Sequence, residues 1–124
     1  MRTWNDVRFF KPQEFDSPDA PGSGVNMDLD FVFRLDRLRE EVGYALTINS
    51  GYRTPMHNAA EGGVECSAHT LGFAADIRVL ESRTRIDVVR CAIMLGFRRI
   101  GIDKKFVHLD EDPAKPQDIL WLYS

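Results

Sequence analysis

The sequence predicts an α+β fold in which a small, mostly antiparallel sheet packs with two main helices. Two segments, residues 28–42 and 82–95, repeat apolar residues at helical spacing. Short β-prone runs lie between and after them, and residues 99–102 and 106–110 are separated by a tight connection that is typical of a hairpin. With 124 residues, the chain is long enough for one domain with one core, residues 1–124.

The first 26 residues are expected to form an irregular arm that packs on the rest of this domain. The stretch 1–26 contains three prolines and two glycines and shows little periodicity. Aromatic side chains would hold the arm in place, and these are Trp4, Phe9, Phe10 and Phe15.

An amphipathic helix is predicted from Asp28 onward. Its apolar residues recur at intervals of four, three and four, and they are Phe31, Leu35, Leu38 and Val42. Gly43 stands where a C-terminal cap is expected. Residues 45–48 then predict a short strand, and the Asn-Ser-Gly that follows is typical of a turn.

A short helix is expected to begin at Thr54-Pro55, because threonine caps helices and proline suits the first helical position. Gly62 and Gly63 would end it. Residues 74–80 predict a strand in which Asp76 points away from the apolar face, which is formed by Ala75, Ile77 and Val79.

The second long helix is predicted over residues 82–95, with Ser82 or Thr84 as its cap and Gly96 at its end. Its apolar residues at helical spacing are Ile86, Val89 and Ile93, with Cys91 and Ala92 alongside. In the hairpin that follows, strand alternation places His108 and Asp110 on one face. Residues 119–123 are expected to add a last strand or an apolar tail.

Composition argues against several classes of partner. The net charge of −3 and the scattered Lys and Arg residues leave no basic surface for nucleic acid, and no apolar run is long enough for membrane insertion. Cys66 and Cys91 are expected to stay unbridged, and the protein is expected to be a monomer. The N-terminus lacks the charged and apolar regions of a signal peptide.

Two histidines and an aspartate form the pattern that carries chemistry. His69, Asp76 and His108 lie in a loop, in the strand after it and in the second hairpin strand, so they converge if these strands are neighbours. A catalytic zinc needs three protein ligands of these types and one open position. Taken singly, each histidine fits a structural role as well, and Asp76 fits a cap or an ion pair with Arg78 or Arg99.

The sequence around these residues closely resembles the M15 zinc peptidases, the group of D-alanyl-D-alanine carboxypeptidases and phage endolysins, and its short bacterial and phage branch most. The resemblance rests on Ser50-Gly51-Tyr52-Arg53, on the Ser67 to Ile77 segment with its SxHxxGxAxD pattern, and on His108-Leu109-Asp110. It extends from about Phe10 to Asp110. It implies a hedgehog/DD-peptidase-like fold.

The resemblance also implies that His69, Asp76 and His108 bind Zn²⁺ and that the substrate is a peptidoglycan stem peptide. Arg53 matches the arginine that binds or orients substrate, although a structural ion pair is the alternative. Ser67 is expected to line the site or to hydrogen-bond a ligand, unless it caps a turn. His57 is expected to be a structural histidine.

One position departs from the family pattern. Many members carry a Glu or Asp three residues before the second histidine as the general base, whereas this chain has Lys105. Asp110 is the first candidate to replace it, and Asp103 is the second. If neither acts, the domain is an inactive zinc module that binds cell wall or belongs to a phage particle.

The expected activity is zinc-dependent hydrolysis of a peptidoglycan amide bond by metal-activated water. A D-Ala-D-Ala carboxypeptidase and an L-Ala-D-Glu-type endopeptidase are both compatible with the sequence. The expected location is the cytoplasm until release to the cell wall, as in phage lysis, or the virion.

Overall fold

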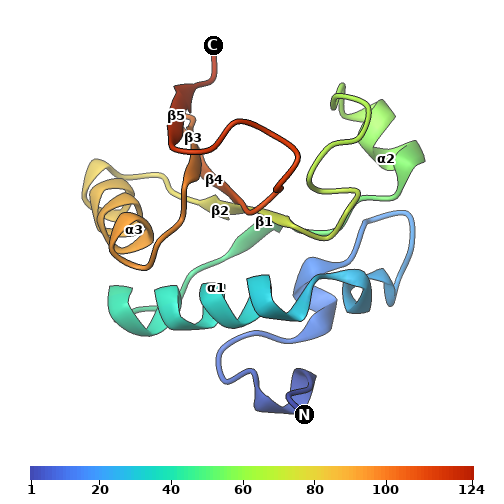
Figure 1. Ribbon diagram of the computed structural model, residues 1–124, viewed down its shortest axis with the longest axis horizontal. Helices are drawn as coiled ribbons and strands as arrows, with labels where there is room; N and C mark the ends of the chain where they lie inside the picture. Colours follow the sequence, from blue (N-terminus) through green and yellow to red (C-terminus); the bar gives the residue numbers. More distant parts are fainter.

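A five-stranded sheet with two helices on one face forms the core of the computed structural model, which describes residues 1–124 (Figure 1). The strand order is β1-β2-β4-β3-β5, and only β3 and β5 pair in parallel. The α+β class and the mostly antiparallel sheet are therefore confirmed. In chain order the elements are η1 (Trp4–Asp6), η2 (Pro12–Phe15), η3 (Ser23–Asn26), α1 (Leu29–Val42), β1 (Ile48–Ser50), α2 (Pro55–Ala60), β2 (Ala74–Arg78), α3 (Ser82–Met94), β3 (Arg99–Ile102), β4 (Phe106–Asp110) and β5 (Ile119–Leu122).

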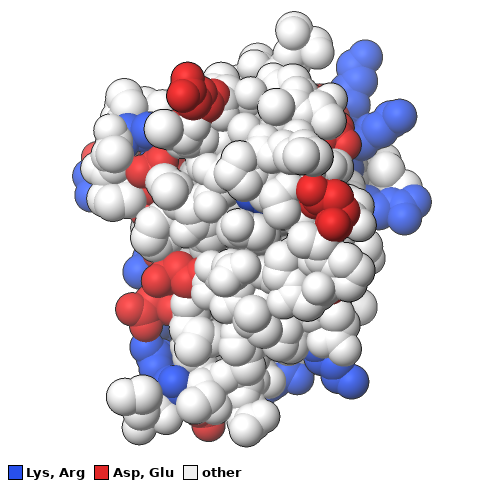
Figure 2. Space-filling model, turned by 90° about the vertical axis from the view of Figure 1, so that its right-hand side faces the viewer, with Lys and Arg blue, Asp and Glu red and all other residues white.

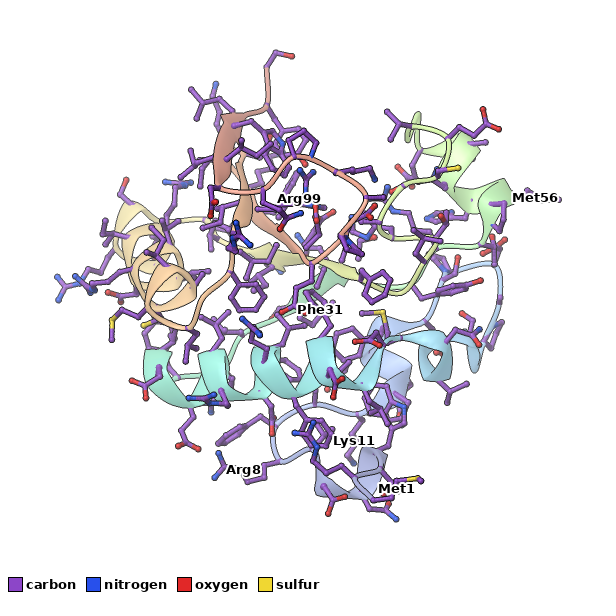
Figure 3. The ribbon with its side chains drawn as sticks, viewed as in Figure 1. Met1, Arg8, Lys11, Phe31, Met56 and Arg99 are labelled. Carbon is purple, nitrogen blue, oxygen red and sulfur yellow. The ribbon has the colours of Figure 1, made fainter.

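Helix α1 begins and ends as its sequence predicts. The side chain of Asp28 accepts a hydrogen bond from the Phe31 N–H (3.0 Å), and Gly43 closes the helix in the left-handed conformation with φ of 87°. The buried side of α1 includes Phe31, Leu35 and Leu38. Figure 3 shows Phe31 between α1 and the sheet, so this helix supplies much of the core.

The N-terminal segment is less irregular than expected, because it contains the three short 3₁₀ helices η1, η2 and η3. Phe10 and Phe15 are buried in the core and Trp4 packs against it, whereas Phe9 remains exposed. Asp36 of α1 anchors the segment: its carboxylate accepts the backbone N–H groups of Arg8 (2.9 Å) and Phe9 (2.8 Å).

The anchoring role of Asp36 leads to a stability prediction. Asp36 is 4% exposed, and Asp36→Ala leaves the N–H groups of Arg8 and Phe9 without a hydrogen-bond partner. The free energy of unfolding should therefore fall by about 2 kcal/mol. Asp30→Ala is the control, because the Asp30 side chain is 80% exposed and pairs only with Arg2 at the surface. Urea unfolding measures both, and equal stability of the two variants would contradict the anchoring role.

Strand β1 lies later in the chain than predicted. The expected strand at residues 45–48 is wrong apart from its last residue, and the predicted turn at Asn49 and Ser50 belongs to the strand. An irregular register explains the shift: Ile48 pairs with Ile77, but Ser50 pairs with Asp76, so the pairing with β2 includes a bulge. The bulge brings Ser50 beside Asp76.

Helix α3 buries only part of the predicted face, since Cys91 and Ala92 are buried and Val89 is partly buried against the core. Its buried residues are Val88, Cys91 and Ala92, while Ile86 and Ile93 are about half exposed (52% and 59%). Neither Ser82 nor Thr84 caps the helix, since Glu81 is the N-cap residue and makes no side-chain cap. The helix packs on β4 and α1 through its small side chains, which allow a close approach.

The remaining elements follow the predictions closely, although β2 ends at Arg78 rather than at residue 80. Strands β3 and β4 have the predicted bounds, and α2 starts at Pro55 with a cap from Thr54, whose hydroxyl accepts the His57 N–H (3.1 Å). Cys66 and Cys91 are both free. None of the helices combines the length and the apolar character that crossing a membrane requires.

The two faces of the sheet differ, because one is apolar and packs on the helices and the other is polar. Side chains that point toward α1 and α3 are fully or almost fully buried: Ala75, Ile77, Ile100, Val107 and Leu109. The opposite face carries polar and aromatic residues, and Arg99 lies on that side in Figure 3. Helix α2 lies away from α1 and α3 (Figure 1). The side of the molecule that includes α2 has few charged groups at its centre (Figure 2).

Candidate metal centre

One row of paired residues crosses the polar face of the sheet, which is the face opposite to α1 and α3. Ser50 pairs with Asp76, Asp76 with His108, His108 with Gly101, and Gly101 with Trp121. Because paired residues in neighbouring strands lie about 4.5–5.5 Å apart, this register alone places Asp76 and His108 side by side. The prediction that Asp76 points away from the apolar face is confirmed.

His69 reaches the same place from the loop before β2. The Ser67 hydroxyl accepts the His69 N–H (3.2 Å), and the Ser67 carbonyl accepts the Thr70 hydroxyl (2.6 Å), so Ser67 shapes the turn that carries His69. The His69 Nδ1 lies 2.8 Å from the carbonyl oxygen of Gly51. With Nδ1 donating to that carbonyl, Nε2 keeps its lone pair free for the site.

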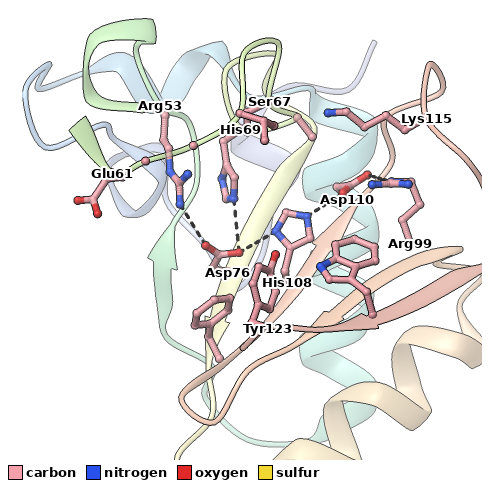
Figure 4. A pocket seen from close by; sticks show the side chains of 16 residues that line it. Arg53, Glu61, Ser67, His69, Asp76, Arg99, His108, Asp110, Lys115 and Tyr123 are labelled. Atoms are coloured by element: carbon pink, nitrogen blue, oxygen red, sulfur yellow. Dashed lines mark hydrogen bonds and ion pairs between the residues drawn. The ribbon is translucent and has the colours of Figure 1, made fainter. Parts of the chain in front are cut away.

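The three predicted ligands form one buried group (Figure 4). Their donor atoms all lie within 4.8 Å of one another. The Oδ1 of Asp76 is 2.8 Å from His108 Nδ1 and 3.4 Å from His69 Nε2. The three residues are between 4% and 7% exposed. Two imidazole nitrogens and a carboxylate oxygen are a donor set that zinc favours, so these residues fit a zinc ion.

The outer nitrogen of His108 meets a second carboxylate. His108 Nε2 lies 2.7 Å from Asp110 Oδ2, and the other oxygen of Asp110 accepts from Arg99 Nε (2.7 Å) and from the Asp112 N–H (3.1 Å). Such a carboxylate fixes the tautomer and orientation of a metal-binding histidine. These contacts support a positioning role for Asp110; its role as the general base stays a prediction.

The pKa values in this group follow from its charges. Burial alone would raise the pKa of Asp76, but hydrogen bonds from His108 and His69 hold it well below its usual range. Burial alone would lower the pKa of His108, but hydrogen bonds to Asp110 and Asp76 raise it instead. His108 therefore favours its protonated form more than a free imidazole does, because a carboxylate faces each of its two ring nitrogens.

A pH prediction follows for the metal-free protein. Because the folded pKa of His108 is raised, its stabilising effect is fully present below the unfolded pKa of about 6.5 and is lost as the pH rises through the folded pKa. Urea unfolding in a chelator should therefore show lower stability at about pH 9 than at about pH 6. His108→Gln should remove most of this difference, and an unchanged difference would exclude His108 as its source.

Arg53 is held beside Asp76 by three side chains. Its guanidinium donates to Ser50 Oγ (3.0 Å), to Asn58 Oδ1 (3.3 Å) and to Asp76 Oδ2 (3.3 Å). The side chain is 17% exposed and lines the cavity above the metal group. The ion pair expected of a structural arginine is therefore present, and the guanidinium keeps two further N–H donors beyond the three that these contacts use.

The cavity above the metal group has a volume of about 700 Å³. It contains His69, Asp76, His108, Arg53, Ser67 and Asp110. Its lining also includes Arg99, which the sequence suggested only as an ion-pair partner of Asp76, and residues that the sequence did not single out: Glu61, Phe106, Lys115, Trp121 and Tyr123. For Trp121 and Tyr123 the sequence does contain a signal, because residues two apart in a predicted strand have side chains on the same face.

The other residues discussed from the sequence lie outside this cavity. Asp103 accepts the Lys105 N–H (2.9 Å) within the hairpin turn, and neither residue lines the cavity. His57 faces Glu61 across one turn of α2, at 3.6 Å between Nε2 and Oε1. The pairing of Asp76 with Arg78 or Arg99 is wrong, because its arginine partner is Arg53.

The comparison with protein families agrees with this geometry. Residues 12–110 match the family described as Peptidase M15, and this range contains all three residues of the metal group. No match is found among curated proteins. Since the match covers most of the chain, the protein belongs to the M15 peptidase family, a family of zinc-dependent metallopeptidases.

Proposed function

We propose that this protein is a zinc-dependent peptidoglycan peptidase that hydrolyses an amide bond of the stem peptide or cross-link. The observation that carries the proposal is the buried group of His69, Asp76 and His108 at the floor of a 700 Å³ cavity. A peptide segment can enter such a cavity, and the group supplies the ligands of a catalytic zinc.

Zinc held by His69, Asp76 and His108 would supply a Lewis acid that polarises the scissile carbonyl and makes water acidic enough to react near neutral pH. Hydrolysis adds hydroxide to the carbonyl carbon, breaks the C–N bond and delivers a proton to the leaving amine. Arg53 would orient the substrate by donating to a carbonyl or carboxylate oxygen. Its contacts with Ser50 and Asn58 keep the guanidinium fixed for this purpose.

The charge of the cavity supports a stem-peptide substrate. Three cationic side chains of its lining, Arg53, Arg99 and Lys115, are matched by three carboxylates, Glu61, Asp76 and Asp110, so a bound zinc ion would leave the cavity with a net positive charge. The Lys115 Nζ bridges Asp112 (2.9 Å) and the Cys66 carbonyl (3.1 Å) at the cavity edge. Stem peptides carry free carboxylates on their D-amino acids, which these cations can attract. Both a terminal D-Ala-D-Ala bond and an L-Ala-D-Glu bond meet this condition.

Digestion of purified peptidoglycan tests the proposal. Zinc-loaded protein is expected to release soluble fragments, and mass spectrometry of these fragments identifies the bond that is cut. Loss of D-alanine alone would indicate a carboxypeptidase, whereas separated stem peptides would indicate an endopeptidase. Full lytic activity in a chelator, with no zinc in the purified protein, would contradict the proposal.

An inactive zinc module is the second candidate. Lys105 stands where many relatives of this type carry the base, and Asp110 already binds Arg99 and His108. In this case the protein would bind cell wall or form part of a phage particle. One zinc per chain without any turnover of peptidoglycan or D-Ala-D-Ala peptides would favour this candidate.

A further inference from the structure

The C-terminal strand brings two aromatic residues onto the metal centre. Trp121 and Tyr123 lie beyond residue 110, where the family match ends, yet both line the cavity. Strand β5 pairs in parallel with β3, and its register places Trp121 in the row that contains His108 and Asp76. Tyr123 follows two residues later, and its N–H donates to the Ile102 carbonyl (2.9 Å). Alternation therefore puts its side chain on the same face.

Gly101 provides the space for these two rings. A Cβ at Gly101 would lie 2.7 Å from ring atoms of both Trp121 and Tyr123, so only glycine lets the rings lie directly on β3. The ring centroid of His108 is 5.4 Å from that of Trp121 and 6.5 Å from that of Tyr123. The Phe106 ring, 5.2 Å away, packs on the other side of Tyr123. The phenol is thus held in one position beside a metal-binding histidine.

The hydroxyl group of Tyr123 points into the metal centre. In Figure 4 it rises between Asp76 and His108, toward the space below His69. The Trp121 ring packs beside the phenol, and the two ring centroids are 6.3 Å apart. A phenol hydroxyl carries one proton that it can donate, and because Tyr123 lines the cavity this proton is available to a bound substrate. Tyr44 differs, because its hydroxyl donates to Asp87 (2.8 Å) at the surface.

We propose that Tyr123 is a catalytic residue whose hydroxyl donates a hydrogen bond to the scissile carbonyl oxygen as negative charge develops on it. This inference rests on the proposed peptidase function and adds a residue to its site. A donor that is already fixed where charge develops lowers the barrier without reorganisation. Trp121 positions the phenol, and Gly101 provides the space that both rings need.

Tyr123→Phe tests this role, with Tyr44→Phe as the matched control. On soluble muropeptides the zinc-loaded Tyr123→Phe protein should lose about 100-fold in kcat with little change in KM, as expected for one oxyanion donor. Its zinc content should equal that of the wild type. Gly101→Ala should lower kcat as well, because the added Cβ displaces both rings.

A binding measurement provides a readout besides turnover. Acetohydroxamate titrated into the cobalt-loaded proteins, followed by visible absorption, should bind about tenfold more weakly to Tyr123→Phe than to Tyr44→Phe, because one hydrogen bond to a charged oxygen is lost. Equal kcat and equal hydroxamate affinity would overturn the inference while leaving the peptidase intact. Loss of metal in Tyr123→Phe would also overturn it and indicate a purely structural ring. A wild type without turnover would refute the peptidase function and this inference together.

Discussion

Replacing His108 with alanine is expected to abolish zinc binding and peptidoglycan cleavage together. His108 faces Asp76 Oδ1 at 2.8 Å through Nδ1, and it is buried, so no solvent-exposed group can take its place. Loss of an outer-shell partner typically costs 10–100-fold in metal affinity, and loss of a ligand should cost more than about 100-fold. Metal analysis after dialysis and release of soluble muropeptides measure the two effects.

His57→Ala is the control for this variant. His57 is the only histidine outside the metal group, and it faces Glu61 rather than Asp76. Its replacement should leave one zinc per chain and normal cleavage. Circular dichroism of metal-free His108→Ala shows whether the fold is retained. A folded His108→Ala protein that retains its zinc would show that the metal is bound elsewhere and would contradict this prediction.

Local signals in the sequence predict the positions of Asp76 and His108, whereas His69 lies in a loop without such a signal and is assigned to the group only through the resemblance of its flanking sequence. Asp76 and His108 belong to strands whose alternation is unambiguous, and the hairpin fixes the position of β4 beside β3. The bulge between Ile48 and Ser50 has no such signal, because it arises from the pairing of β1 with β2. The exposed Ile86 and Ile93 of α3 likewise fit a helical stripe that tertiary packing does not use.

The aromatic part of the site depends on a contact that the sequence does not reveal. Residues 119–123 are equally compatible with a strand and with an apolar tail, and their parallel pairing with β3 joins segments separated by the whole hairpin. Only this pairing places Trp121 and Tyr123 next to His108. Position 101 requires glycine because both rings lie over it, and the sequence gives no sign of this requirement before the position of the rings is known.

Asp110→Asn is expected to weaken zinc binding about 10–100-fold, because Asp110 fixes the tautomer of His108. Arg99 Nε and the Asp112 N–H both donate to Asp110 Oδ1, so the amide oxygen of asparagine must remain there. Its NH₂ group then faces His108 Nε2 and donates to it. His108 would carry its proton on Nδ1, the nitrogen that faces Asp76, and could not offer a lone pair to the metal.

The same variant separates positioning from base catalysis. If Asp110 moves the proton, Asp110→Asn keeps its zinc affinity and loses about 10²–10⁴-fold in kcat at saturating zinc. Glu61→Gln is the necessary comparison, because Glu61 is the one cavity carboxylate outside the group of Asp76 and Asp110. A kcat loss in Glu61→Gln with full zinc content, together with weak zinc binding in Asp110→Asn, would assign the base to Glu61. Zinc titration of both variants before kinetics therefore decides which carboxylate acts on water and which acts on His108.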